Sequence, residues 1–250
     1  MLLKLLNKIK KIRERSRQRT IKKQAKLVNN SKAIKEERLA AIDFFSNLND
    51  ATIAVPNLLA RFKYSLEHSI NDSREKENAL AGIINFGEEA IPFLRENILN
   101  SEQIAWPVKV LEKIATQEDI KNILWDCLDL EDVSLDSKKI DKNYDILCYL
   151  RDFKLPSSGE KLLFMLDVHD ERIRFATTEI LLKQDEEIIY RELEKFITDE
   201  KTENTRIRQA ILKHFAEIKR KIYDKTSIKI GPLIGNYILA EDYKIKIRPS

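Results

Sequence analysis

The chain has 250 residues, of which 43% are hydrophobic and 34% charged, and it contains only five glycines and six prolines. This length and hydrophobic fraction allow one sizeable core or an array of repeats. The shortage of turn residues argues against β-sandwiches and nucleotide-binding α/β folds, so we expect an all-α protein.

The net charge of +4 is unevenly distributed along the chain. Residues 1–26 contain eleven Lys or Arg side chains and one acid, Glu14, so this segment carries +10 and the remainder carries −6. No apolar run approaches the roughly 18 residues of a membrane-spanning helix. The opening "MLLKLLNKIKK" also lacks the uninterrupted apolar core of a secretory signal. We therefore expect a cytoplasmic protein with an acidic body and a basic arm.

Residues 1–30 form the predicted arm, a basic amphipathic helix. At about 100° per residue, its first apolar side chains share a sector roughly 120° wide, and several cations lie on the opposite side. We expect this helix to bind a partner or an anionic surface. The residues predicted to do so are Leu2, Lys4, Leu5, Lys8, Ile9, Lys11, Ile12 and Arg15.

Several partners fit the arm. On an anionic membrane, its apolar residues would enter the acyl boundary and its cations would approach the headgroups, which places the protein peripherally at the inner membrane face. The strongly cationic "RERSRQRTIKKQAK" also fits a nucleic-acid backbone, although it lacks aromatic residues for base stacking. A groove on a partner protein and the chain's own acidic body are further alternatives. The acid-poor start also resembles an organelle presequence, although lysine outnumbers arginine in it.

Residues 31–222 are predicted to form helices arranged in pairs, because apolar residues recur there at spacings of three and four. Pro56 and Pro92 lie 36 residues apart in aliphatic-Pro-x-Leu phrases, and Pro107 follows. A proline in the first turn of a helix loses no hydrogen bond, so each proline predicts a helix start. A first helix over residues 31–48 is followed by five predicted pairs, at about 51–86, 88–115, 117–152, 157–183 and 186–221.

Two further helix starts are predicted from capping boxes, in which one side chain accepts from an unpaired backbone N–H and an acid three residues later bonds back. These are Asp72-x-x-Glu75 and Ser157-x-x-Glu160. The helices of each pair are roughly a dozen residues long, so one pair cannot bury its apolar stripe without neighbours.

An Ile-Arg-x-Ala phrase occurs twice, at Ile173 in "DERIRFATTEILLKQ" and 34 residues later at Ile207 in "ENTRIRQAILKHFAEIK". Together with "EEAIPFLREN", these phrases resemble HEAT-like repeats over roughly residues 50–220. The resemblance implies a right-handed α-solenoid of about five helix pairs whose second helices line a concave face. It also implies a ladder of acids and arginines between repeats, for which Asp170, Arg174 and Arg208 match; Asn204 replaces the acid beside Arg208.

Residues 223–250 break the helical pattern, with Gly231, Pro232 and Gly235 as breakers. Residues 237–239 and 243–247 are predicted to pair as a small β-hairpin. An isolated hairpin is marginally stable in water, so we expect it to lie against the last helices and cap the array.

The sequence contains no motif that predicts catalysis, a metal site or a cofactor. Its three histidines, His68, His169 and His214, are far apart and share no metal-ligand spacing, and no glycine-rich phosphate loop is present. We therefore expect a non-catalytic scaffold or adaptor without a cofactor or small-molecule substrate. It would bind a protein partner through the array and use the arm as a second anchor.

The alternative is a nucleic-acid-binding HEAT-like protein, either a glycosylase-like cradle or a basic-arm DNA or RNA binder. A cradle needs cations on successive second helices. The Ile-Arg phrases supply four, at Arg172, Arg174, Arg206 and Arg208, but the first pair carries Glu75 and Glu77 and the body is acidic. A continuous duplex cradle is therefore disfavoured.

Overall fold

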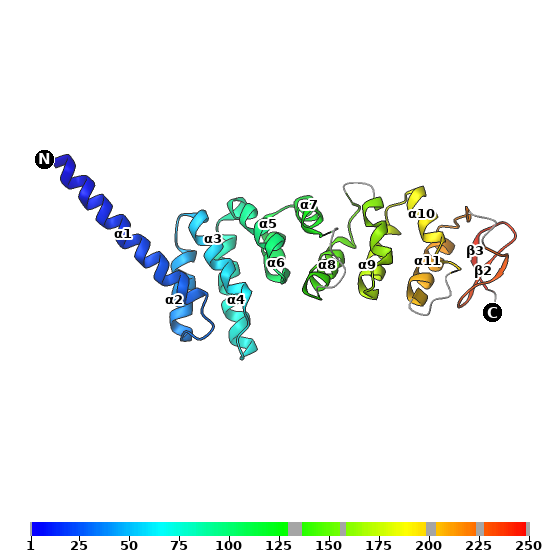
Figure 1. Cartoon of the computed structure of the whole chain (residues 1–250), viewed down its shortest axis with the longest axis horizontal. Helices are drawn as coiled ribbons and strands as arrows, with labels where there is room; N and C mark the ends of the chain where they lie inside the picture. Colours follow the sequence, from blue (N-terminus) through cyan, green and yellow to red (C-terminus); the bar gives the residue numbers. More distant parts are fainter. Residues whose placement is uncertain (1, 130–136, 156–158, 199–203, 224–227, 249–250) are drawn as a thin grey trace. The chain divides into compact units, whose positions relative to one another are not determined.

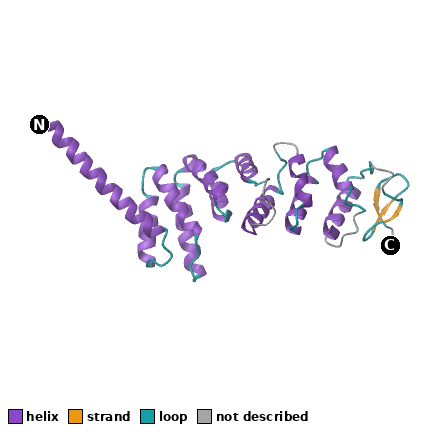
Figure 2. Ribbon diagram, viewed as in Figure 1, coloured by secondary structure: helices purple, strands orange, loops and turns teal. Residues whose placement is uncertain are grey.

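The protein is described by a computed structural model of the chain. It is mostly helical, and a small antiparallel sheet stands near the C terminus (Figures 1 and 2). The structure describes residues 2–129, 137–155, 159–198, 204–223 and 228–248, with side chains from residue 7 onward. The described chain divides into two compact units, Met1–Ile120 and Lys121–Ser250. The sequence gave divisions near residues 30 and 222 and no sign of one at residue 120.

Unit 1 begins with the long helix α1, and α7 crosses its C-terminal boundary. Its elements are α1 (Leu2–Val28), α2 (Lys35–Ser46), α3 (Ala51–Leu59), the 3-10 helix η1 (Ala60–Lys63), α4 (Ser69–Ile84), the 3-10 helix η2 (Gly87–Ala90), α5 (Ile91–Asn100), α6 (Ala105–Ile114) and α7 (Gln117–Cys127). Successive helices pack on one another: α2 lies against α1, α3 and α4, and α6 lies against α4 and α5. Phe45, Leu58, Ile83 and Leu111 are fully buried between them.

Unit 2 contains shorter helices followed by the sheet. Its further elements are α8 (Ser137–Leu150), the 3-10 helix η3 (Gly159–Asp167), α9 (Glu171–Leu181), α10 (Glu187–Glu194), α11 (Thr205–Glu217), β1 (Gly231–Pro232), β2 (Tyr237–Leu239) and β3 (Ile245–Ile247). Helix α9 packs against α8, η3 and α11. The repeated isoleucines, Ile173 and Ile207, have no exposed surface and open the buried stripes of α9 and α11. These positions are therefore core residues.

The predicted hairpin is confirmed. Strands β2 and β3 pair antiparallel, with Tyr237 opposite Ile247 and Leu239 opposite Ile245. The strand β1, at Gly231 and Pro232, adds a third strand beside β2 where the sequence indicated only breakers. A proline is tolerated there because β1 is an edge strand and the missing N–H costs no ladder bond. Strand β3 packs against α11, so the sheet lies on the last helix of the unit.

The proline predictions are confirmed at two of three positions. Pro92 and Pro107 lie in the first turns of α5 and α6. Pro56 instead lies inside α3, which already begins at Ala51, so the prediction of a helix start at Pro56 is wrong. The helix begins a turn earlier because burial of Ala51, Ala54 and Val55 outweighs the hydrogen bond that the proline removes. It changes to a 3-10 helix after residue 59.

The capping box at Asp72 and Glu75 is also wrong. Helix α4 begins three residues before Asp72 and has His68 at its N-cap position. Both carboxylates lie inside the helix, where they pair with arginines from other elements. Ser157, in the other predicted box, lies outside the described residues. The first helix predicted for the fourth pair forms the 3-10 helix η3.

Candidate functional site

The last turns of α1 are fixed to unit 1. Ile21 is 8% exposed and Val28 is fully buried, and this part of the helix packs on α2 and α3. Tyr64 donates a hydrogen bond of 2.7 Å to the carbonyl of Val28, which closes the end of the helix. Arg17 lies 3.8 Å from the carboxylate of Asp50.

The preceding part of α1 extends away from α2 (Figure 1). Every described side chain from residue 7 to residue 20 is exposed, including Ile9 at 40% and Ile12 at 56%. The predicted cations Lys8, Lys11 and Arg15 are exposed beside them. The predicted residues Leu2, Lys4 and Leu5 belong to α1, but their side chains lie outside the described part of the chain. The structure thus brings the predicted arm residues together on one helix with solvent around it.

The exposed apolar stripe of α1 is not a continuation of the face that packs on the body. With about 100° between successive residues, the stripe that contains Ile9 and Ile12 is rotated by about 110° from the sector that contains Ile21 and Val28. Docking of the C-terminal turns therefore leaves the stripe uncovered. This rotation was available from the sequence, but only the burial of Ile21 and Val28 shows which sector the body uses.

A cluster of buried charges lies where α1 joins the body. We call it the ion cluster; its members are Arg38, Arg61, Asp72, Glu75 and Lys76. Glu75 accepts from Arg38 at 2.8 and 3.0 Å and from Arg61 at 3.0 Å. Arg61 and Glu75 are fully buried, and Arg38 is 6% exposed. Three cations thus share two carboxylates in the interior, which satisfies the charges that burial would otherwise leave unpaired.

The ion cluster also contacts the segment that follows α1. Arg38 donates to the carbonyls of Ser31 and Ala33, and the guanidinium of Arg61 lies 4.4 Å from the centre of the Tyr64 ring. Burial raises the pKa of the Asp72 carboxyl, but hydrogen bonds from Lys76, Arg61 and the backbone N–H of Leu66 outweigh it and hold the pKa below its ordinary value. The cluster thereby fixes the base of the arm.

The residues predicted for the repeat ladder lie at the starts of α9 and α11. Asp170 caps α9 by accepting from the backbone of Arg172 and Ile173, and it pairs with the Arg172 side chain at 2.9 Å. Arg172 also reaches Asp141 on α8 at 3.0 Å. Arg174 donates to the carbonyls of Val168 and His169.

Arg208 donates to the carbonyl of Ile197, and Asn204 is buried at the N-cap position of α11. The ion pair between α8 and α9 is therefore made by Arg172, a residue that the sequence analysis did not assign to the ladder. The ladder itself stays a prediction.

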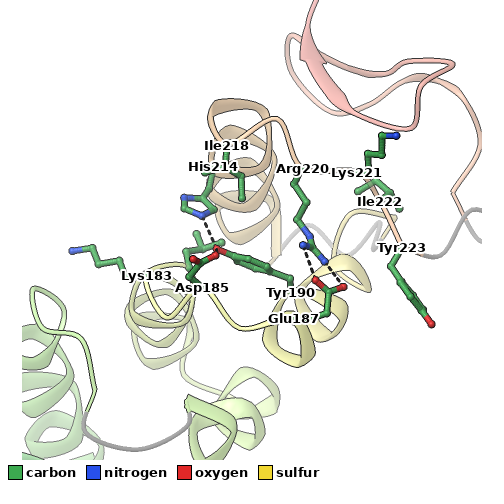
Figure 3. A pocket seen from close by; sticks show the side chains of 11 residues that line it. Lys183, Asp185, Glu187, Tyr190, His214, Ile218, Arg220, Lys221, Ile222 and Tyr223 are labelled. Atoms are coloured by element: carbon green, nitrogen blue, oxygen red, sulfur yellow. Dashed lines mark hydrogen bonds and ion pairs between the residues drawn. The ribbon is translucent and has the colours of Figure 1, made fainter.

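A pocket of about 990 Å³ opens between α10 and α11 (Figure 3). Arg220 forms two hydrogen bonds with Glu187, at 2.8 and 3.0 Å, and lies 4.5 Å from the centre of the Tyr190 ring. The Tyr190 hydroxyl lies 3.4 Å from both the Asp185 carboxylate and His214 Nε2. Because the hydroxyl has one proton, donation to Asp185 requires His214 to present an Nε2–H toward Tyr190.

The pKa shifts in this pocket describe neutral or paired groups. Burial lowers the pKa of His214, against the raising effect of Glu217 and Asp185, so the imidazole is neutral at neutral pH. Burial and the nearby Asp185 raise the pKa of Tyr190, which keeps its hydroxyl protonated. A hydrogen bond from Arg220 lowers the pKa of Glu187. The polar groups thus satisfy one another, an arrangement suited to holding α10 against α11.

Neither a metal cluster nor a membrane-crossing helix is found in the part of the chain that the structure describes. No group of three or more His, Cys, Asp or Glu side chains there is placed to hold a metal ion. None of the helices described is both long and apolar enough to cross a bilayer.

The comparisons with known proteins leave the site to be judged on its geometry. No protein-family model, no curated protein and no solved structure matches the chain. The molecule is thus defined by its own features: a mostly helical body with an exposed basic helix at one end and a small sheet at the other.

Proposed function

We propose that the protein is a non-catalytic adaptor that binds a protein partner through its helical body and anchors itself to an anionic membrane surface through α1. The observation that carries the anchoring role is the exposure of α1 from residue 7 to residue 20, with Ile9 and Ile12 in solvent beside a row of cations. The protein would then lie in the cytoplasm, peripherally bound to the inner face of a membrane.

An anionic bilayer surface satisfies both halves of this helix. Its headgroups attract each Lys or Arg near the surface by about 1 kcal/mol, and its acyl boundary takes up the apolar stripe. A nucleic-acid backbone would neutralise the cations but leave Ile9 and Ile12 in water. The acidic body does not cover the described stripe, because the sector of α1 that packs on α2 and α3 is a different one.

The body that the arm anchors is proposed to be a right-handed α-solenoid of HEAT-like helix pairs. Within each unit, helices that follow one another in the sequence pack on one another. Ile173 and Ile207, the repeated isoleucines, occupy equivalent buried positions at the starts of α9 and α11. Both observations support stacked repeats whose exposed faces are available to a partner.

Co-flotation with lipid vesicles tests the anchoring role. The full chain is expected to float with vesicles that contain phosphatidylserine and to stay unbound with phosphatidylcholine alone. Ile9→Glu places a carboxylate in the apolar stripe and should reduce the bound fraction at least tenfold, because a charge there opposes both insertion and attraction.

Asn7→Glu is the matched control. It introduces the same carboxylate two residues earlier, and position 7 lies about 160° around the helix from Ile9. We expect this variant to lose much less binding than Ile9→Glu. Equal loss in both variants would show that charge alone governs binding, and binding to duplex DNA but not to vesicles would favour the nucleic-acid alternative.

A further inference from the structure

A second surface with mixed apolar and basic character lies in unit 2, between α11 and the C-terminal sheet (Figure 1). Two hollows of about 530 and 590 Å³ meet there and share Lys213, Tyr237 and Ile247 as lining residues. We call the combined surface the tail groove. None of its residues belongs to α1, to the ion cluster or to the pocket of Figure 3.

The apolar face of the sheet continues past the part that α11 covers. Leu239 and Ile245 form a cross-strand pair and are each 1% exposed. The next pair on the same face, Tyr237 and Ile247, lines the groove, and Ile247 is 68% exposed. Alternate residues of a strand share a face, so the inward-facing row ends in solvent at this pair. The groove therefore has an apolar seat with room for a side chain.

Cations outnumber acids around this seat. The lining contains five cations, Arg206, Lys213, Lys219, Lys244 and Lys246, and two acids, Glu217 and Asp242. The two acids are already paired: Lys213 lies 4.0 Å from Glu217, and Lys246 lies 3.0 Å from Asp242. Within the described ranges of the chain, Arg206, Lys219 and Lys244 form no ion pair with a carboxylate.

One of these cations is held in place. The guanidinium of Arg206 lies 3.6 Å from the centre of the Phe175 ring, which restrains the side chain while leaving its hydrogen-bond donors available. A restrained arginine loses less conformational entropy when it pairs with a carboxylate. The charge of the groove thus favours an acidic occupant and disfavours the chain's own basic α1.

We propose that the tail groove binds an acidic peptide segment of a partner protein. One apolar side chain of the segment would rest on Tyr237 and Ile247, and its carboxylates would pair with Arg206, Lys219 and Lys244. This inference rests on the proposed adaptor function and names the surface and the partner chemistry for it. The peptide supplies both kinds of contact that the groove lacks.

Selection from a random-peptide phage library against the full chain tests this proposal. We expect the enriched peptides to combine an excess of Asp and Glu with a leucine, isoleucine or aromatic residue. A synthetic copy of the most enriched peptide, labelled with fluorescein, then gives a dissociation constant by anisotropy. That binding should weaken as salt rises, because the contacts include exposed ion pairs.

Two substitutions and one control locate the binding. Ile247→Ser and Lys244→Glu should each weaken the peptide by about tenfold or more. Both residues lie on the surface of the sheet, and unchanged circular dichroism would show that the fold is kept. Ile230→Ser removes an isoleucine that is 49% exposed but does not line the groove, and it should leave peptide binding unchanged.

The outcomes separate this inference from the anchoring role of α1. Ile9→Glu should leave peptide binding intact, and Ile247→Ser should leave vesicle flotation intact. The inference is overturned if no peptides are enriched, if the enriched peptides are neutral or basic, or if Ile247→Ser and Lys244→Glu bind them as well as the parent chain. It is also overturned if sedimentation shows that the chain alone dimerises through residues 244 and 247, because the occupant would then be a second copy.

Discussion

The ion cluster of unit 1 and the Arg220–Glu187 pair of unit 2 have the same chemistry in different surroundings. In the ion cluster, Arg61 and Glu75 are both inaccessible to solvent. In the second pair, Arg220 is mostly buried but the Glu187 side chain is 52% exposed. Water and salt screen the exposed carboxylate, whereas the buried one has only its two arginines to compensate its charge. Burial should therefore decide how much each pair matters.

The comparison also separates the roles of the two pairs. The ion cluster joins α2, η1 and α4 and holds the segment after α1, so it supports the base of the proposed anchor. Arg220 connects the end of α11 to α10, where it also covers the Tyr190 ring. One pair is a structural requirement of its unit, and the other adds a local contact at the rim of a pocket.

The largest expected effect is that of Glu75→Ala. It leaves Arg38 and Arg61 buried without their shared carboxylate, and removal of one partner of a buried pair costs about 3–5 kcal/mol. Urea unfolding of the variant should show a loss of this size. Glu77→Ala, two residues later on α4 at an exposed position, should change the free energy of unfolding by less than about 0.5 kcal/mol. Similar losses in both variants would contradict the distinction between buried and exposed charges.

Acid should weaken the ion cluster through Asp72. Its pKa is lowered in the folded state, so its stabilising effect is complete above the unfolded pKa of about 4 and is lost as the pH falls through the lower folded value. Asp72→Asn should therefore flatten the decline of the free energy of unfolding between about pH 5 and pH 2. Urea unfolding at several pH values measures this slope. Asp43→Asn, at an exposed position on α2, is the control, and an equally flattened slope there would contradict the assignment.

The smallest effect is expected for Glu187→Gln. The carboxylate is half exposed, and Arg220 keeps a second carboxylate, Glu194, at 3.5 Å. The free energy of unfolding should fall by less than about 1 kcal/mol. A loss as large as that of Glu75→Ala, measured by the same urea unfolding, would show that exposure does not govern these pairs.

The sequence predicted those parts of the fold whose signals are local. The hairpin was visible as alternation in "YKIKI", and Pro92 and Pro107 marked helix starts because proline acts on its own turn. The ion cluster was not predictable in this way. Arg38 lies 37 residues from Glu75, and nothing near Glu75 distinguishes a buried partner from an N-terminal cap. Tertiary partners thus overrode the local capping pattern.

The candidate site divides in the same way. The apolar stripe and cations of α1 follow from helical periodicity, so the sequence identified them, but the uncovered state of Ile9 and Ile12 depends on which sector packs on the body. The tail groove could not be predicted, because it requires residues near 206 and 247 to meet across α11 and β3. Its only local signal was the alternation of lysine and isoleucine in the last strand.

The most direct test of the anchoring role measures which side of α1 enters the membrane. A tryptophan placed at position 9 (Ile9→Trp) or at position 11 (Lys11→Trp) reports contact with acyl chains when brominated phosphatidylserine vesicles quench its fluorescence, after subtraction of the signal from Trp106 and Trp125 in the parent chain. These positions lie about 160° apart around the helix. We predict strong quenching at position 9 and weak quenching at position 11. Equal quenching at both positions, or none at position 9, would contradict the proposal that α1 anchors the protein through its apolar stripe.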